Sequence, residues 1–310
     1  MIDFTNCKKL NKSYTGANGK KICVVYNNEK YMLKFPSAPT KETELSYANG
    51  CISEYISCHI FNMLGIEAQS TLLGTYTTDK NKEKIVVACK DFTDIGVVLQ
   101  DFGSLKNQVI DSEQNGYGTD LNSILDTIDQ QTQIDPYTIL ERFWDMFVVD
   151  SLLGNFDRHN GNWGFLYNQI YDSISLAPVY DCGSCLLPQA DKSTIEKILS
   201  SDAEMNNRIY NYPTSAIKIN DKKINYHSYL SSTEDRNCLN SVIKIKQKYN
   251  QNEIFGFINS VDCIDDLQKD FYKQYISQRY DKIILPAFLH AQDVMHNLEN
   301  QNADEIDLEI

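Results

Sequence analysis

The 310-residue sequence predicts an α+β fold with two lobes, a small N-terminal lobe rich in β-strands and a larger helical lobe. Up to about residue 92, short runs of β-branched and aromatic residues surround one helical pattern. Beyond that point, apolar residues recur mainly at helical spacing. We therefore expect an N-lobe over residues 1–92, a hinge near residues 90–95 and a helical C-lobe over residues 93–296.

The elements of the N-lobe follow from local patterns. Two apolar, β-prone runs at 22–26 and 31–35 flank a short polar segment and predict a hairpin. Apolar residues at helical spacing predict a helix over residues 48–64, and Gly65 stands where a glycine commonly ends a helix. Residues 85–88 predict a further strand.

In the C-lobe the most apolar segment predicts a long buried helix. Asp135 and Pro136 are a favourable N-cap and first-turn pair, and the helical pattern they begin continues to Leu152 before Gly154 closes it. Its large aromatic residues are most simply explained by core packing: Phe143, Trp144 and Phe147.

Later segments alternate between hairpin and helix. Residues 163–167 and 175–180 predict a second hairpin, and helical patterns resume over 193–210 and 265–295. Residues 297–310 carry five acidic residues and no basic one. We interpret them as an acidic, solvated and mobile tail.

Composition argues against several classes of protein. The formal net charge of −13 argues against direct binding of nucleic acid, because such binding needs a basic surface. No stretch approaches the ~18 consecutive apolar residues of a membrane span, and the N-terminus lacks the apolar core of a signal peptide. Nine irregularly spaced cysteines indicate reduced thiols rather than a disulfide framework, so we expect a cytoplasmic protein.

The strongest functional signal is the segment NFDRHNGN, followed nineteen residues later by Asp-Cys-Gly. Phosphoryl transfer needs a carboxylate to orient the attacking hydroxyl, oxygen ligands for magnesium and positive charge on the phosphates. Asp157 and Asn162 are five residues apart, as in the catalytic loop of kinases, and a second carboxylate, Asp181, follows the predicted hairpin. An isolated Asp-Arg-His is commonplace, but the three residues in this order predict an ATP- and Mg²⁺-dependent phosphotransferase.

The same segments resemble two known groups of kinases. DRHxxN followed by a DxG-type aspartate resembles the phosphatidylinositol-kinase branch. The wider sequence is similar to HipA-type serine/threonine kinases, through YANGCISEYISCHI, FWDMFVVDSLLGNFDRHNGNWGF and PVYDCGSCLLPQAD. The similarity covers nearly the whole chain before the tail and implies a kinase-like fold with bound ATP and Mg²⁺.

The resemblance implies roles for the residues of the C-lobe. Asp157 would be the catalytic base, and Asn162 and Asp181 would bind magnesium. His159 lies two residues after Asp157, where protein kinases often have a lysine that contacts phosphate, and it would serve the same end.

It also implies an ATP site in the N-lobe. Lys34 would hold the α- and β-phosphates and Glu54 would pair with it, although each residue could equally be an ordinary solvated one. The backbone at Asp91 and Phe92 would hold adenine.

A glycine turn before the first hairpin would form the phosphate loop of this site. Its residues are Gly16, Ala17, Asn18 and Gly19, and the resemblance identifies Ser13 as an autophosphorylation candidate. HipA-type toxins have a further subdomain before this loop, whereas here the loop begins near residue 13, so an antitoxin partner is not expected. Delivery to another cell is implied by the resemblance alone.

Two motifs are interpreted as unrelated to catalysis. Asp101-Phe102-Gly103 spells a kinase metal motif but precedes the catalytic loop, so we interpret it as a turn. Cys182 and Cys185 have CxxC spacing, but no second Cys or His pair lies nearby to complete a zinc site, which indicates a local pair of thiols.

Three functions remain open at this level. The leading hypothesis is a serine/threonine protein kinase that also phosphorylates itself, with a nucleotide and a protein substrate as partners. The second is a phosphoinositide or other small-molecule kinase, which the residues Arg158 and His159 leave open and the acidic total charge disfavours. The third is a pseudokinase that acts as a binding module, which the presence of Lys34, Asp157 and Asp181 disfavours.

Overall fold

The computed structural model describes residues 1–14, 20–36, 48–109 and 116–308. Within these ranges no helix is both long and apolar enough to cross a membrane. The proposed phosphate turn, Gly16 to Gly19, lies outside the described residues.

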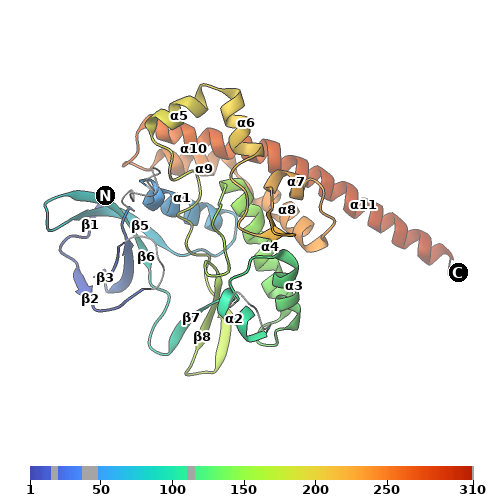
Figure 1. Cartoon of the computed structure of the whole chain (residues 1–310), viewed down its shortest axis with the longest axis horizontal. Coiled ribbons are helices and arrows are strands. Elements are labelled where there is room, and N and C mark those ends of the chain that lie inside the picture. Colours follow the sequence, from blue (N-terminus) through green and yellow to red (C-terminus); the bar gives the residue numbers. More distant parts are fainter. Residues whose placement is uncertain (15–19, 37–47, 110–115, 309–310) are drawn as a thin grey trace.

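The N-lobe is a six-stranded sheet with the order β1-β5-β6-β4-β3-β2 (Figure 1). All pairs are antiparallel except β1 with β5, which is parallel. The strands are β1 Ile2–Asp3, β2 Lys8–Leu10, β3 Lys21–Tyr26, β4 Glu29–Lys34, β5 Thr71–Thr77 and β6 Glu83–Lys90. The β3–β4 hairpin and the strand at 85–88 are therefore confirmed.

Strand β1 is too short to show a sequence pattern, and its position depends on one glycine of β5. A Cβ atom on Gly74 would lie 2.3 Å from the carbonyl oxygen of Ile2 and 2.5 Å from the ring of Phe4. Only a residue without a side chain lets β1 approach β5 this closely.

Helix α1, Gly50–Met63, packs against β5 and β6. Ile52, Ile56 and Ile60 lie on its buried face, in agreement with the predicted period. Gly65 has φ of +79°, the left-handed conformation that follows many helix ends, so the expected glycine stop is confirmed.

A second, three-stranded sheet with the order β7-β8-β9 belongs to the C-lobe and lies apart from the six-stranded sheet (Figure 1). Its strands are β7 Val97–Asp101, β8 Gly164–Asn168 and β9 Ser173–Leu176, and the β8–β9 hairpin confirms the second predicted hairpin. Asp101 ends β7, and α2, Phe102–Val109, begins at once. Our interpretation of this motif as a turn is therefore wrong, because the Asp101 carboxylate accepts the N–H of Ser104 at 2.7 Å and starts a helix.

Helices make up most of the C-lobe, with one short two-stranded ribbon, β10 Lys218–Ile219 and β11 Lys222–Lys223. The remaining helices are α3 Leu121–Gln130, α4 Pro136–Leu153, α5 Lys192–Leu199, α6 Asp202–Tyr210, α7 Tyr226–Leu230, α8 Arg236–Lys248, α9 Gln251–Asn259, α10 Asp266–Arg279 and α11 Leu285–Leu308, with a π-helical turn at Tyr280–Ile284 between the last two.

Helix α4 is the centre of the C-lobe core. Asp135 accepts the N–H of Thr138, Pro136 occupies the first turn, and Gly154 ends the helix at φ of +67°. The three aromatic residues expected in the core are buried: Phe143, Trp144 and Phe147.

The helical patterns at 193–210 are confirmed as two helices, because Ser201 accepts the N–H of Glu204 and starts α6. The expectation for the end of the chain needs correction. We expected a solvated, mobile tail over residues 297–310, but α11 continues to Leu308, so residues 297–308 are helical. Extending a helix that is already formed needs one residue at a time to be ordered, so an acidic extension can continue the helix where it could not have nucleated one.

Candidate active site

Lys34 on β4 forms ion pairs with residues from both lobes. Its Nζ atom lies 2.9 Å from Glu54 Oε2 on α1 and 2.9 Å from Asp181 Oδ1, which follows β9. The other oxygen of Glu54 accepts the N–H of Cys182 at 3.2 Å. Glu54 therefore holds both the lysine and the backbone next to Asp181.

Charge and burial reinforce this arrangement. The Lys34 ammonium lowers the pKa of Asp181 to about 2, so this carboxyl is ionised. Burial disfavours the charged lysine, but the carboxylates of Asp181 and Glu54 outweigh it and raise the pKa of Lys34 above its usual value. Burial raises the pKa of Glu54, and Lys34 opposes that rise.

The loop after α4 is held by its own side chains. Asn155 Oδ1 accepts the N–H of Asp157 at 3.0 Å, and Asn162 Nδ2 donates to the carbonyl oxygen of Asp157 at 2.8 Å. The hydrogen bond to Asn162 uses the amide nitrogen, which leaves the amide oxygen as the atom suited to bind a metal.

Burial raises the pKa of Asp157, and the electrostatic interaction with the nearby His159 opposes the rise. Asp181 also contributes to raising this pKa, so the two carboxylates are close enough to interact. His159 Nδ1 accepts the N–H of Gly161 at 3.0 Å. This hydrogen bond leaves Nε2 as the ring nitrogen that can contact a ligand.

Arg158 is a buried residue whose role the sequence reasoning missed. Its Nε lies 2.9 Å from Asp150 Oδ2 on α4, and its Nη1 donates to the carbonyl oxygens of Asn162 and Tyr180. Arg158 therefore holds the end of the catalytic loop next to the residue before Asp181. The signal for this pair was Asp150, a carboxylate within the apolar last two turns of α4.

In the expected hinge, the N–H of Asp91 donates to the carbonyl oxygen of Lys30 at 2.9 Å. That the backbone at Asp91 and Phe92 holds adenine stays a prediction. The Asp91 carboxylate binds Lys12 at 2.5 Å and the hydroxyl of Tyr14 at 2.8 Å. Exposed Ser13 lies between these two residues.

Phe92 contacts the segment that ends at Asp181. Its ring lies 5.8 Å from the ring of Tyr180, which directly precedes Asp181. The expected site residues that the structure describes therefore form two groups held by ion pairs or hydrogen bonds, one around Lys34 and one around Asp157. Phe92, from the expected hinge, lies beside Tyr180.

The donor atoms fit magnesium. Asn162 and Asp181 supply an amide oxygen and an ionised carboxylate, and magnesium commonly uses one or two such ligands together with phosphate oxygens and water. The described residues contain no cluster of three or more His, Cys, Asp or Glu side chains suited to hold a metal. A magnesium ion here would therefore be held by this pair together with the phosphates of ATP.

All nine cysteines are free thiols, and Cys182 and Cys185 are buried. Arg158 Nη2 lies 3.3 Å from Cys182 Sγ. The Cys182 thiol, in the residue after Asp181, thus contacts the buried guanidinium.

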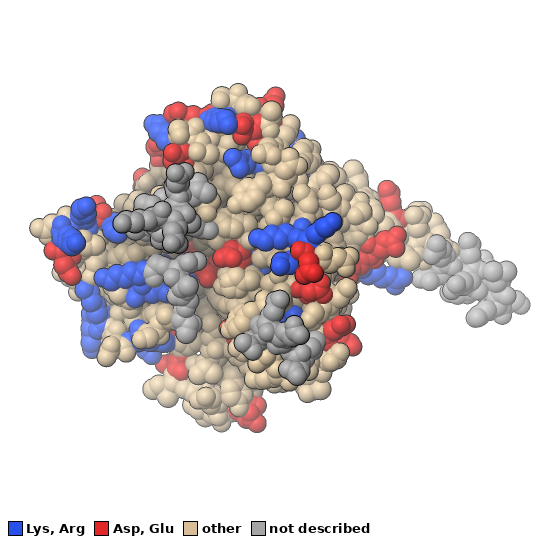
Figure 2. All heavy atoms as spheres, in the orientation of Figure 1, with Lys and Arg blue, Asp and Glu red and all other residues tan. Residues whose placement is uncertain are grey.

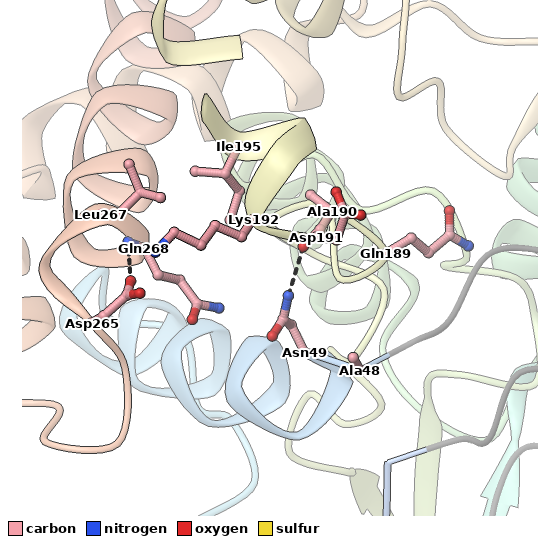
Figure 3. Close-up of a pocket in the computed structure, with 10 residues that line it drawn as sticks. All are labelled: Ala48, Asn49, Gln189, Ala190, Asp191, Lys192, Ile195, Asp265, Leu267 and Gln268. Atoms are coloured by element: carbon pink, nitrogen blue, oxygen red, sulfur yellow. Dashed lines mark hydrogen bonds between the residues drawn. The ribbon is translucent and has the colours of Figure 1, made fainter. Parts of the chain in front are cut away.

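A separate pocket of about 180 Å³ lies at the N-terminal end of α1 (Figure 3). Asn49 donates to the carbonyl oxygen of Ala190 across its edge at 2.9 Å, and Lys192 and Asp265 also line it. No residue expected to bind nucleotide or metal lines this pocket.

The sheet, the lysine–glutamate pair and the loop with its following aspartate define a protein of the kinase-like class. A model of the HipA-like C-terminal domain family matches residues 12–244. The chain belongs to this family, and the two-lobed α+β fold expected from the sequence is confirmed.

Two comparisons concern one relative. The serine/threonine-protein kinase CtkA of Helicobacter pylori is 47% identical to this chain over an alignment of 314 positions that covers 99% of this chain and 95% of CtkA. The crystal structure of the H. pylori proinflammatory kinase CtkA matches with a TM-score of 0.89 and 48% identity, covering 94% of this chain and 98% of CtkA.

A more distant match shows the fold alone. HipA of Shewanella oneidensis, in its complex with HipB and operator DNA, matches with a TM-score of 0.51 and 14% identity. The match covers 91% of this chain and 66% of that one.

Proposed function

We propose that this chain is a serine/threonine protein kinase that uses ATP and Mg²⁺ and also phosphorylates itself. The observation that carries the proposal is the contact of Lys34 with both Glu54 and Asp181, since it joins the two lobes at the place where ATP phosphates and a metal must meet. The similarity to CtkA, a serine/threonine-protein kinase by name, supports the choice of acceptor.

The side chains divide the chemistry between them. The Asp157 carboxylate accepts the proton of the acceptor hydroxyl while the hydroxyl oxygen forms a bond to the γ-phosphorus and the bond to the β,γ-bridging oxygen breaks, with ADP as leaving group. Lys34 holds the α- and β-phosphates, and Glu54 orients Lys34. Magnesium, when bound at Asn162 and Asp181, would neutralise phosphate charge.

His159 and the free thiols complete the proposal. His159, which interacts electrostatically with Asp157, would contact the transferred phosphate. All nine thiols are free, and this supports the proposal that the protein acts in a reducing compartment such as the cytoplasm.

The test is transfer of radiolabelled γ-phosphate by wild-type protein and by Asp157→Asn. Each protein is incubated with itself alone, with a generic protein substrate and with phosphoinositide vesicles. We expect label on the chain and on protein, and little with Asp157→Asn. Label on lipid alone, or equal transfer by both forms, would contradict the proposal.

A further inference from the structure

The β10–β11 ribbon concentrates positive charge in an acidic lobe. Residues 93–310 contain 17 basic and 33 acidic residues, a net charge of −16. Lys218 lies directly opposite Lys223 in the ribbon, and Lys222 lies opposite Ile219. Like charges directly opposite each other on paired strands are unfavourable. Within the described part of the chain, none of the three lysines forms an ion pair.

The incoming strand of the ribbon, β10, is held by a hydrogen bond to the segment before α3. The turn residues of the ribbon, Asn220 and Asp221, have φ of +51° and +62°, the conformation that tight two-residue hairpins require. The N–H of Lys218 donates to the carbonyl oxygen of Thr119 at 2.8 Å. Catalytic-loop residue Asn160 donates to the carbonyl oxygen of Gly118 at 2.9 Å, so the ribbon and the loop share one support.

The outgoing strand is tied to the catalytic loop from the other side. Tyr226, three residues after Lys223, donates from its buried hydroxyl to the carbonyl oxygen of Asn155 at 2.6 Å. Asn155 lies two residues before Asp157. The positive charge of Lys223 is close enough to contribute to lowering the pKa of Asp157, although burial dominates that pKa.

On the molecular surface, basic side chains gather between α3 and α7 (Figure 2). The ribbon belongs to this region, because it pairs with the segment before α3 and leads directly into α7. Lys222 and Lys223 are exposed there and free to contact a ligand.

We propose that Lys222 and Lys223 select the acceptor sequence, favouring Ser or Thr residues that have Asp or Glu close by in the chain. This inference rests on the proposed kinase function. The acceptor hydroxyl must meet Asp157, and an extended peptide advances about 3.3 Å per residue. Residues two or three positions from the acceptor are therefore ~7–10 Å away, within the reach of lysine side chains anchored beside the catalytic loop. The acidic surface of the rest of the C-lobe would otherwise disfavour such peptides.

The test compares peptides that contain a single serine. One peptide has neutral flanks, and the others carry Asp residues at successive positions from three before to three after the serine. Wild type, the double variant Lys222→Ala/Lys223→Ala and the charge reversal Lys222→Glu/Lys223→Glu are assayed for kcat and KM. The matched control is Lys80→Ala/Lys82→Ala, which removes two lysines from the turn between β5 and β6.

We expect wild type to prefer at least one acidic peptide, mainly through KM, by roughly 3- to 10-fold, the sum of two exposed charge pairs. The preference should shrink as salt rises. The alanine variant should lose it while keeping its activity on the neutral peptide, the reversal variant should disfavour acidic peptides, and the control should match wild type.

Two results would overturn the inference while leaving the kinase function intact. One is equal use of all peptides by wild type. The other is a loss in the alanine variant that appears as a raised KM for ATP on every peptide, which would place the lysines at the nucleotide. Absence of transfer to any peptide or to the chain itself would overturn the kinase function and this inference together.

Discussion

The Nζ atom of Lys34 lies 2.9 Å from the Oδ1 atom of Asp181, although 147 positions separate the two residues in the chain. Asp181 has φ of +57°, a left-handed conformation that is uncommon for residues other than glycine. The backbone is thus held in a sparsely populated conformation where its carboxylate meets the lysine. Strain of this kind is frequent at functional sites.

Replacing Asp181 with Ala should abolish metal-dependent nucleotide binding, because it removes the ionised ligand beside the phosphates. Calorimetry with ATP, in the presence of Mg²⁺ or of EDTA, measures this. Asp79→Ala, an exposed carboxylate in the β5–β6 turn, is the matched control. A folded Asp181→Ala protein with unchanged Mg²⁺-ATP affinity would show that the metal assignment is wrong.

Activity should fall on the acid side at a higher pH than an ordinary aspartate would give. A carboxyl group acts as a general base only in its ionised form, and burial raises the pKa of Asp157. The value of kcat/KM should therefore be retained above that pKa and decline as the pH falls through it. His159 opposes the rise. In His159→Gln the acid limb of the kcat/KM profile should therefore move to higher pH. An unchanged or downward-shifted limb would remove His159 from the surroundings of the base.

Breaking the buried pair of Arg158 with Asp150 should destabilise the C-lobe. Arg158→Met leaves a buried carboxylate without its partner, which costs roughly 3–5 kcal/mol. The double variant Asp150→Leu/Arg158→Met should recover much of that loss, since no charge is left buried. Urea unfolding followed by circular dichroism compares the three proteins. Equal midpoints for Arg158→Met and wild type would contradict the role given to this pair.

Ser13 should be phosphorylated by the enzyme itself. It is exposed between Lys12 and Tyr14, which both bind Asp91 at the hinge. A phosphate adds roughly −1.5 to −2 charges, which would be repelled by ATP and would compete with Asp91 for Lys12. Mass spectrometry should find the phosphate in wild type and not in Asp157→Asn. Its presence in the inactive variant would indicate another kinase, and modification of other residues alone would exclude Ser13.

Local signals predicted the parts of the fold whose causes are local. The β3–β4 hairpin, α1 with Gly65 and α4 between Asp135 and Gly154 each carry their own turn or cap residues. Strand β1 could not be predicted, because two residues have no periodicity and their pairing with β5 depends on the distant Gly74. The helical end of α11 was not predicted, because we gave more weight to the acidic composition of these residues than to the helix that precedes them.

The same limit applies to the site. Spacing led us to Asp157, Asn162 and Asp181, since kinase chemistry fixes the order of such residues along the chain, and their roles stay predictions. The contact of Arg158 with the carbonyl oxygen of Tyr180 could not be predicted, because the two residues are 22 positions apart and meet only once α4 and the second hairpin are packed. The position of the β10–β11 ribbon beside the catalytic loop likewise depends on long-range hydrogen bonds from Asn160 and Tyr226.

The most direct test of the account is single-turnover phosphate transfer by Asp157→Asn with Mg²⁺-ATP affinity measured on the same protein. Asn preserves the size of the side chain and removes its capacity to accept a proton. We predict a transfer rate at least ~100-fold below that of wild type, in line with the usual contribution of a general base, at Mg²⁺-ATP affinity within about twofold. Transfer at the wild-type rate would contradict the assignment of Asp157 as the base and, with it, the proposed mechanism.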